Sequence, residues 1–150
     1  MSSGAGGGSG SGGYILGASN PVGTGEGLSI IQNQHAYAFS GLHATSGTPA
    51  DHLKFTTGNY YIVGTLFCNG AVAEGATSGQ VTTFEIKFNG LGIAMIRTRT
   101  STDDNPSSQY NDILIPPYTE VAVTVTSGGG GSETTSLVLT GRVYLCQESD

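Results

Sequence analysis

Three histidines, His35, His43 and His52, are the side chains of this sequence best suited to acid–base chemistry or to metal binding. His35 and His43 are eight residues apart in a segment that reads as one strand. At the rise of a strand they share a face but stand roughly 26 Å apart, which is too far for one metal ion. We therefore interpret the histidines as surface or interface residues.

An acidic segment is the second group with chemical potential. Asp103, Asp104 and Asn105 lie together between Ser101 and Gln109, and Asp112 follows nearby. Their oxygens are of the kind that bind a divalent cation. Polar loop tips have the same composition, and we favour a solvated loop over a metal site. No metal and no cofactor is predicted for this chain.

The sequence lacks the motifs that accompany nucleophilic, phosphoryl-transfer and metalloprotease chemistry. His-Glu-x-x-His, Gly-x-Ser-x-Gly and Gly-Lys-Ser/Thr do not occur. The stretch from Gly8 to Gly13 fits Gly-x-Gly-x-x-Gly by letter, but it follows no strand and opens no helix. Because no feature supplies both a nucleophile and an activating base, we predict that the protein is not an enzyme.

The composition is that of one small all-β domain. The chain has 150 residues, of which only 11% are charged, and 25 residues are glycine. The formal net charge is -6 and the 5 basic residues form no run, so we expect no binding to nucleic acid. No segment reads as a signal peptide or as a membrane span, so we expect a soluble protein without membrane contact.

Polar and apolar residues alternate from Leu28 onward, and turn residues interrupt the alternation at the intervals of a β-sandwich. The pattern predicts eight or nine strands in two stacked antiparallel sheets, and no helix. Residues 28–150 would form the sandwich domain, and residues 1–27 would form an extended glycine-rich arm. The expected strands are 28–32, 35–44, 52–55, 59–68, 81–88, 91–98, 112–115, 119–126 and 135–146.

Two hairpins are predicted. Asn89-Gly90 is the preferred pair for a two-residue turn, and it joins 81–88 to 91–98. In that register one face of the hairpin is core, and it carries the apolar residues Phe84, Ile86, Phe88, Leu91, Ile93 and Met95. The second hairpin would join 121–125 to 137–145 through the glycine-rich segment 127–133.

The final predicted strand is apolar on both faces, so we expect it at the centre of a sheet or at a subunit interface. Its alternate positions are Leu137, Leu139, Val143 and Leu145 on one side and Val138, Tyr144 and Cys146 on the other. We interpret Cys68 and Cys146 as buried free thiols rather than a disulfide. Pro116 and Pro117 indicate a rigid corner between the two sheets.

Residues 1–13 carry no charge and no apolar side chain worth burying. Ordering them would cost roughly 13 to 26 kcal/mol, so we expect a neighbouring subunit or another protein to hold this arm.

Two sets of residues are candidate partner-binding sites. Tyr14, Ile15 and Leu16 form an apolar anchor directly after the glycine run, with capping of the chain's own sandwich as the alternative. Arg97 and Arg99 alternate on one strand and would reach acidic groups of a neighbour, or else form an ordinary solvated strand end.

Several segments resemble small phage virion proteins with a jelly-roll fold. These segments are 35–41, 53–64, 88–90, 113–121 and 139–144. Within them, Gly58-Asn-Tyr-Tyr-Ile-Val63 and Thr140-Gly-Arg-Val-Tyr144 are similar to the Gly-x-Tyr-x-Val strand of trimeric complement and tumour-necrosis-factor heads. The resemblance implies an antiparallel jelly-roll β-sandwich that forms a homotrimer.

For function, the resemblance implies a non-enzymatic capsid decoration or cement protein that stabilises a phage head by binding its major capsid protein. The implied location is the virion, assembled in the host cytoplasm. One alternative is the receptor- or glycan-binding tip of a phage fibre or tail, with 70–80 and 101–109 as contact loops. Another is a jelly-roll capsid or spike protein. Fold alone does not choose among them.

Overall fold

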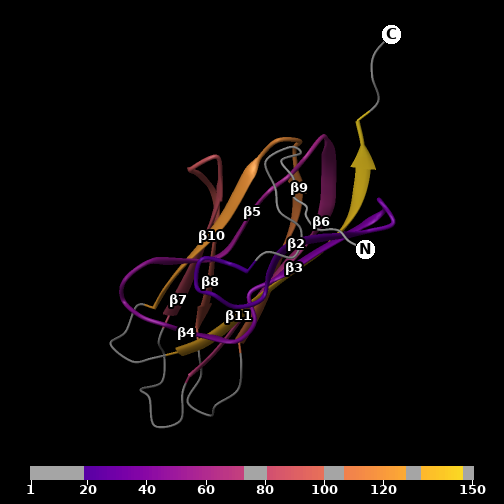
Figure 1. Cartoon of the computed structure of the whole chain (residues 1–150). Helices are drawn as coiled ribbons and strands as arrows, with labels where there is room; N and C mark the ends of the chain where they lie inside the picture. The colour runs from indigo at the N-terminus through magenta and orange to yellow at the C-terminus, as the bar shows by residue number, and fades with distance from the viewer. Residues whose placement is uncertain (1–18, 73–80, 100–106, 128–132, 147–150) are drawn as a thin grey trace.

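The computed structural model describes residues 19–72, 81–99, 107–127 and 133–146 of the chain. Within these ranges the protein is all-β, and its strands carry the labels of Figure 1. The strands are β2 (Glu26–Ile31), β3 (His35–Phe39), β4 (His43–Thr45), β5 (Ala50–Thr56), β6 (Tyr60–Val72), β7 (Val81–Phe88), β8 (Leu91–Arg99), β9 (Ser107–Ile115), β10 (Glu120–Ser127) and β11 (Glu133–Leu145). Of the predicted glycine-rich arm, residues 1–18 lie outside the described residues, whereas residues 19–27 are described and the last two of them belong to β2.

The strands form two antiparallel sheets. One has four strands in the order β5-β10-β7-β8, and the other has six, in the order β2-β3-β11-β6-β9 with β4 also paired to β11. In Figure 1, β7 and β10 of the four-stranded sheet lie on the left, and β6 and β9 of the six-stranded sheet lie on the right. Successive strands from β5 to β11 alternate between the two sheets except at the β7–β8 hairpin, so the predicted all-β jelly-roll sandwich is confirmed.

The core lies between the two sheets and is built from alternate positions on each strand. From the four-stranded sheet it takes Leu53, Phe55, Phe84, Ile86, Val121, Val123 and Val125, and from the six-stranded sheet mainly Leu28, Ile62, Leu66, Cys68, Ile115, Leu137 and Leu139. Both cysteines are free. Cys68 is fully buried, and this burial raises the pKa of its thiol to about 12, so the thiol is inert. Cys146 is only half-buried.

The hairpin at Asn89-Gly90 is confirmed, but its predicted register is wrong beyond the turn. Both turn residues have positive φ, and Phe88 pairs with Leu91 as expected. A β-bulge then intervenes, because Lys87 pairs with Gly92 while Ile86 pairs with Ala94. The extra residue moves every later β8 side chain to the opposite face. Ala94 and Ile96 therefore pack against the core, and Met95 is exposed.

The second predicted hairpin does not form. Strand β10 pairs with β5 and β7, whereas β11 pairs with β3, β4 and β6 in the other sheet. The two strands therefore belong to different sheets. The expected corner at Pro116-Pro117 is confirmed, because it connects β9 of one sheet to β10 of the other. The hydroxyl of Thr57 donates a hydrogen bond of 2.8 Å to the Pro116 carbonyl at this corner.

Two other strand predictions need correction. The expected strand 35–44 is broken into β3 and β4, because the chain turns at Gly41, whose φ is +73°. The expected strand 112–115 begins earlier, at Ser107, and pairs with β6 along its whole length. Strand β11 lies between β3 and β6, so its predicted central position is confirmed.

Candidate functional site

The outer face of the six-stranded sheet carries an unusual number of exposed apolar side chains. On β6, the buried residues Ile62 and Leu66 alternate with the exposed Tyr61, Val63 and Phe67. The same alternation continues on the neighbouring strands. We call the outward-pointing set the aromatic face, and its apolar members are Ile31, Tyr37, Phe39, Tyr61, Val63, Phe67, Tyr110, Leu114, Val138 and Tyr144.

Strand register places these side chains beside one another. Phe67 lies opposite Tyr110 on β9 and Val138 on β11, and the rings of Phe67 and Tyr110 have centroids 6.0 Å apart. Val63 lies opposite Leu114, and Tyr61 lies opposite Tyr144. Leu114 is 54% exposed and Tyr110 is 68% exposed. Apolar side chains of the aromatic face therefore lie as neighbours across adjacent strands and are not a scatter of single residues.

A polar row crosses the aromatic face and is satisfied within the chain. Thr65 lies between Asp112 and Thr140, and its hydroxyl donates a 2.9 Å hydrogen bond to Asp112 Oδ1. Further along, the Ser108 hydroxyl donates to Asn69 Oδ1 at 2.7 Å. Among the described side chains of the sheet, the charged ones on this face are Arg142, Asp112 and Glu26, and the Ser29 hydroxyl donates a 2.6 Å hydrogen bond to Glu26 Oε2. A partner would therefore bury little unpaired charge here.

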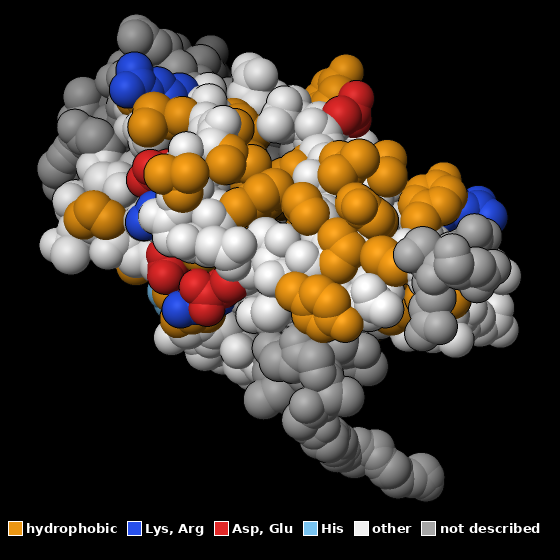
Figure 2. Space-filling model, turned by 90° about the horizontal axis from the view of Figure 1, so that it is seen from above, with side chains coloured by type: hydrophobic (Ala, Val, Ile, Leu, Met, Phe, Trp, Pro, Cys, Tyr) orange, Lys and Arg blue, Asp and Glu red, His pale blue; other side chains and the backbone are white. Residues whose placement is uncertain are grey.

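The outer face of the four-stranded sheet differs. Six of its described side chains, spread over all four strands, are charged: Asp51, Lys54, Glu85, Lys87, Arg97 and Glu120. Lys54 Nζ lies 4.0 Å from Glu120 Oε2. In the space-filling view of Figure 2, hydrophobic side chains gather into a band on the face seen there, and charged side chains lie mostly toward its margins.

The predicted partner-binding residues are only partly described. Tyr14, Ile15 and Leu16 lie outside the described residues, as do Asp103, Asp104 and Asn105. Arg97 is exposed on β8, and its Nη2 lies 3.7 Å from Met95 Sδ. Arg99 ends β8, but its side chain lies outside the description. The structure therefore brings Arg97 to no acidic group among the described residues, and the contacts expected of the other candidates stay predictions.

The histidines are arranged differently from the expectation. His35 is exposed on β3, whereas His43 on β4 meets His52 on β5, with ring centroids 5.0 Å apart. His52 is only 2% exposed, so the interpretation as a surface or interface residue is wrong for this histidine. Burial chiefly, and then the neighbouring His43, lowers the pKa of His52 to about 4, while Asp51 acts in the opposite direction. No group of three or more potential metal-ligating side chains occurs within the described ranges.

The sequence did not single out the residues of the aromatic face, although a signal was present. Apolar residues on both sides of the last strand predicted a central or interface position, and the same pattern occurs in β6, where Tyr61, Val63 and Phe67 alternate with core residues. A strand of a two-layer sandwich needs an apolar pattern on one side only. The second apolar side therefore had no partner within the domain.

Comparison with known proteins adds a weak structural likeness. The sequence matches no protein-family model and no curated protein. Among solved structures, "Structure of Eiger TNF from S. frugiperda" is similar with a TM-score of 0.45 and 11% sequence identity, over 78% of this chain and 94% of that chain. Within the described ranges, no helix has the length and apolar character needed to cross a bilayer.

Proposed function

We propose that the protein is a non-enzymatic structural protein that forms a homotrimer through the aromatic face. The observation that carries this proposal is the exposure of Tyr61, Val63, Phe67, Tyr110 and Leu114 on one side of the sheet. A large exposed apolar patch on a small protein marks an interaction surface. Tyrosine and phenylalanine are enriched in the cores of such surfaces, and charged residues are depleted there.

Self-association explains the chemistry of this face better than a charged or nucleic acid partner. Arg142 and Asp112 are opposite in sign and lie on strands that flank β6, so facing copies can pair them. The number three comes from the resemblance of the sequence motifs to trimeric jelly rolls and not from the shape of the face.

The second part of the proposal is that the trimer decorates a phage head and binds the major capsid protein. The support is the motif resemblance together with the glycine-rich composition of residues 1–13. Without side chains, such a segment lets its backbone approach a partner closely and form strand-like hydrogen bonds. Tyr14, Ile15 and Leu16 would then anchor the arm. The protein would act in the virion after assembly in the host cytoplasm.

The oligomer is tested by sedimentation equilibrium on the full chain and on two matched variants. Leu114 on the aromatic face and Met95 on the opposite sheet are both 54% exposed. A lysine at either position should therefore have the same effect on the stability of the folded monomer. We expect trimers for the wild type and for Met95→Lys, and folded monomers for Leu114→Lys. A monomeric wild type, a dimer, or an unchanged mass for Leu114→Lys would contradict the proposal.

The virion role is tested separately. Mass spectrometry of purified virions should detect the chain, and removal of residues 1–16 should leave a folded trimer that no longer binds the capsid shells. Unchanged occupancy of the shells by the truncated protein would refute the role of the arm. Binding of the isolated sandwich to host cells, with no chain on the heads, would instead favour a receptor-binding tip.

A further inference from the structure

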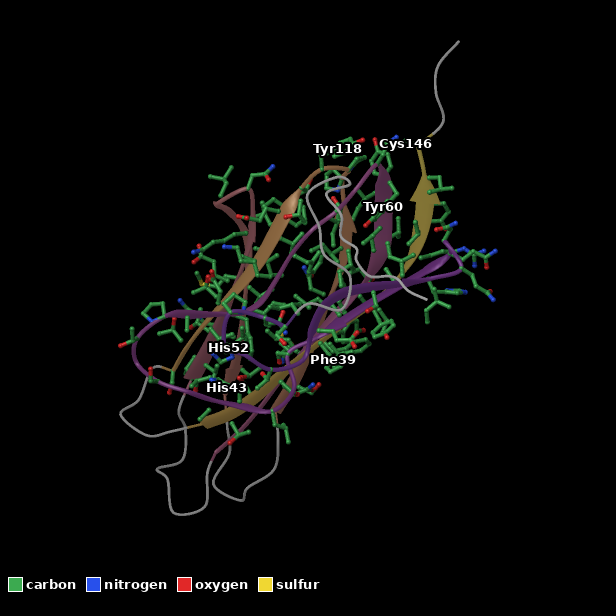
Figure 3. All side chains as sticks on the ribbon, in the orientation of Figure 1. Phe39, His43, His52, Tyr60, Tyr118 and Cys146 are labelled. Atoms are coloured by element: carbon green, nitrogen blue, oxygen red, sulfur yellow. The ribbon has the colours of Figure 1, made fainter. Side chains whose placement is uncertain are left out.

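The contact between His43 and His52 joins the two sheets. His43 lies on β4, which pairs with β11 of the six-stranded sheet, and His52 lies on β5 at the edge of the four-stranded sheet. The two rings meet edge to face, with an interplanar angle of 88° and centroids 5.0 Å apart. Figure 3 shows the labelled pair at the end of the sandwich away from Tyr60 and Tyr118.

The His52 ring is unusually placed for a titratable group. Its exposed fraction is 2%, and its buried Nδ1 has no hydrogen-bond partner among the described residues. A buried imidazole with an unsatisfied nitrogen is stable only while the ring is neutral, because a charged ring would need a partner or water. The ring of the half-buried His43 packs directly against it.

The elements packed around the pair offer little compensation for a positive charge. On β5, Asp51 precedes His52, but its Oδ1 accepts a 2.6 Å hydrogen bond from the hydroxyl of Thr124 on β10. On β11, the Thr135 hydroxyl donates to the carbonyl of His43 at 3.4 Å. Neither threonine titrates, and the side chain of Glu133 lies outside the described residues. Asp51 is thus the described carboxylate that acts on His52.

We propose that the His43–His52 contact is an acid-sensitive latch: neutral rings hold β4 against β5, and protonation separates the two sheets at this end. Segment 46–49 connects the two strands, and the Ser46 carbonyl accepts a 2.8 Å hydrogen bond from the Ser127 amide. Opening of the latch therefore exposes the crossing between the sheets and the end of β10, while the Asn89-Gly90 hairpin stays paired. The inference is independent of the proposed trimer.

The direction of the pH effect follows from the depressed pKa of His52. In the folded protein this pKa is about 4, whereas the unfolded value is 6.5. Between these values the unfolded chain binds more protons, so stability is complete above pH 6.5 and falls as the pH decreases toward 4. Between pH 7 and pH 4.5 this one group raises the unfolding equilibrium constant on the order of 100-fold.

The test compares the wild type with His52→Gln and with His35→Gln, which removes an exposed histidine, by urea unfolding at pH 7 and pH 4.5. We expect the unfolding equilibrium constants of the wild type and of His35→Gln to rise by the same factor when the pH falls from 7 to 4.5. The factor for His52→Gln should be smaller by about 100-fold. An equal loss in all three proteins overturns the proposal.

A measurement on the wild type alone guards against failure of the variant to fold. Nuclear magnetic resonance titration should show the His52 ring protonating well below the ordinary range of a histidine, with amides of β4 and β5 losing hydrogen-exchange protection before those of β7 and β8. If His52 protonates in the ordinary range, or if all four strands open together, no latch exists.

Discussion

On the outer face of the four-stranded sheet, Lys54, Glu85, Lys87 and Arg97 carry charges of both signs, whereas the outer face of the six-stranded sheet exposes tyrosine, phenylalanine, valine and leucine. Of the 5 basic residues in the chain, only Arg142 belongs to a strand of the six-stranded sheet. Both sheets contribute alternating apolar side chains to the same core. The difference therefore concerns what lies outside each sheet.

The contrast is between two layers that share one folding role and differ in the chemistry of their outer faces. The four-stranded sheet carries charges of both signs on its outer face, and its strand β8 also exposes Leu91, Ile93 and Met95. Charged side chains on a sheet oppose its pairing with other molecules. The apolar outer face leaves the six-stranded sheet with surface to bury, and another copy of the chain covers it in our proposal.

The largest effect is expected at the centre of the six-stranded sheet, where Gly64 on β6 faces Gly141 on β11. A Cβ on Gly64 would lie 2.2 Å from the Thr140 carbonyl oxygen, so backbone would have to move. We expect Gly64→Ala to lower the free energy of unfolding by about 3 kcal/mol or to prevent folding. Calorimetry and urea unfolding measure this change.

Gly47 provides the control for that substitution. Its Cβ would meet only the Ser127 carbonyl oxygen at 3.9 Å, an ordinary contact. Gly47→Ala should therefore change stability by less than about 0.5 kcal/mol. Equal effects of the two substitutions would show that the strands do not approach closely at Gly64.

A matched pair of threonines compares the two outer faces directly. On the four-stranded sheet, Thr124 is 7% exposed and its hydroxyl donates to Asp51 at 2.6 Å. On the six-stranded sheet, Thr65 makes the same kind of bond to the exposed Asp112 at 2.9 Å. We expect Thr124→Val to cost about 1.5 to 2 kcal/mol, because a partly buried, charge-assisted hydrogen bond is lost.

Thr65→Val should cost less than about 0.5 kcal/mol, because water replaces the lost hydroxyl at Asp112. Chemical denaturation of the two variants under one condition gives both values. If Thr65→Val is the more damaging change at a concentration where the protein is monomeric, the assignment of burial to the two faces is wrong.

The smallest effect is expected for the ion pair of Lys54 and Glu120. The two side chains are 41% and 47% exposed, and the charged atoms are 4.0 Å apart. Glu120→Gln should change the unfolding free energy by less than about 0.5 kcal/mol, and the difference should shrink as salt is added. A loss that persists in high salt would mean that this surface is covered, and the contrast between the faces would weaken.

Much of this fold is predictable from local patterns. The Asn89-Gly90 turn, the Pro116-Pro117 corner and the central place of β11 all follow from residue chemistry that acts over a few positions. The bulge near Ile93 does not follow from local residue chemistry, because neither neighbour of that residue interrupts the alternating pattern of the strand. The predicted hairpin between β10 and β11 failed for a related reason: a glycine-rich connection does not say which sheet the next strand joins.

The functional surfaces were harder to predict than the fold. The approach of His43 to His52 depends on a turn at Gly41 that separates β3 from β4, and on the packing of two sheets. The aromatic face depends on register between β6, β9 and β11, which brings Phe67, Tyr110 and Val138 into one row. The sequence of each strand alone shows only that apolar residues occur at every second position, and it does not show which residues of the other strands lie beside them.

Hydroxyl-radical footprinting of the unmodified chain tests the central claim most directly, because tyrosines on and off the aromatic face serve as internal probes. Tyr61, Tyr110 and Tyr144 are 42%, 68% and 50% exposed in the single chain, and Tyr118, at the turn before β10, is 59% exposed. On raising the concentration, we predict that the first three lose their labelling while Tyr118 keeps it. Labelling that stays equal at all four tyrosines would show that no copy of the chain covers this face.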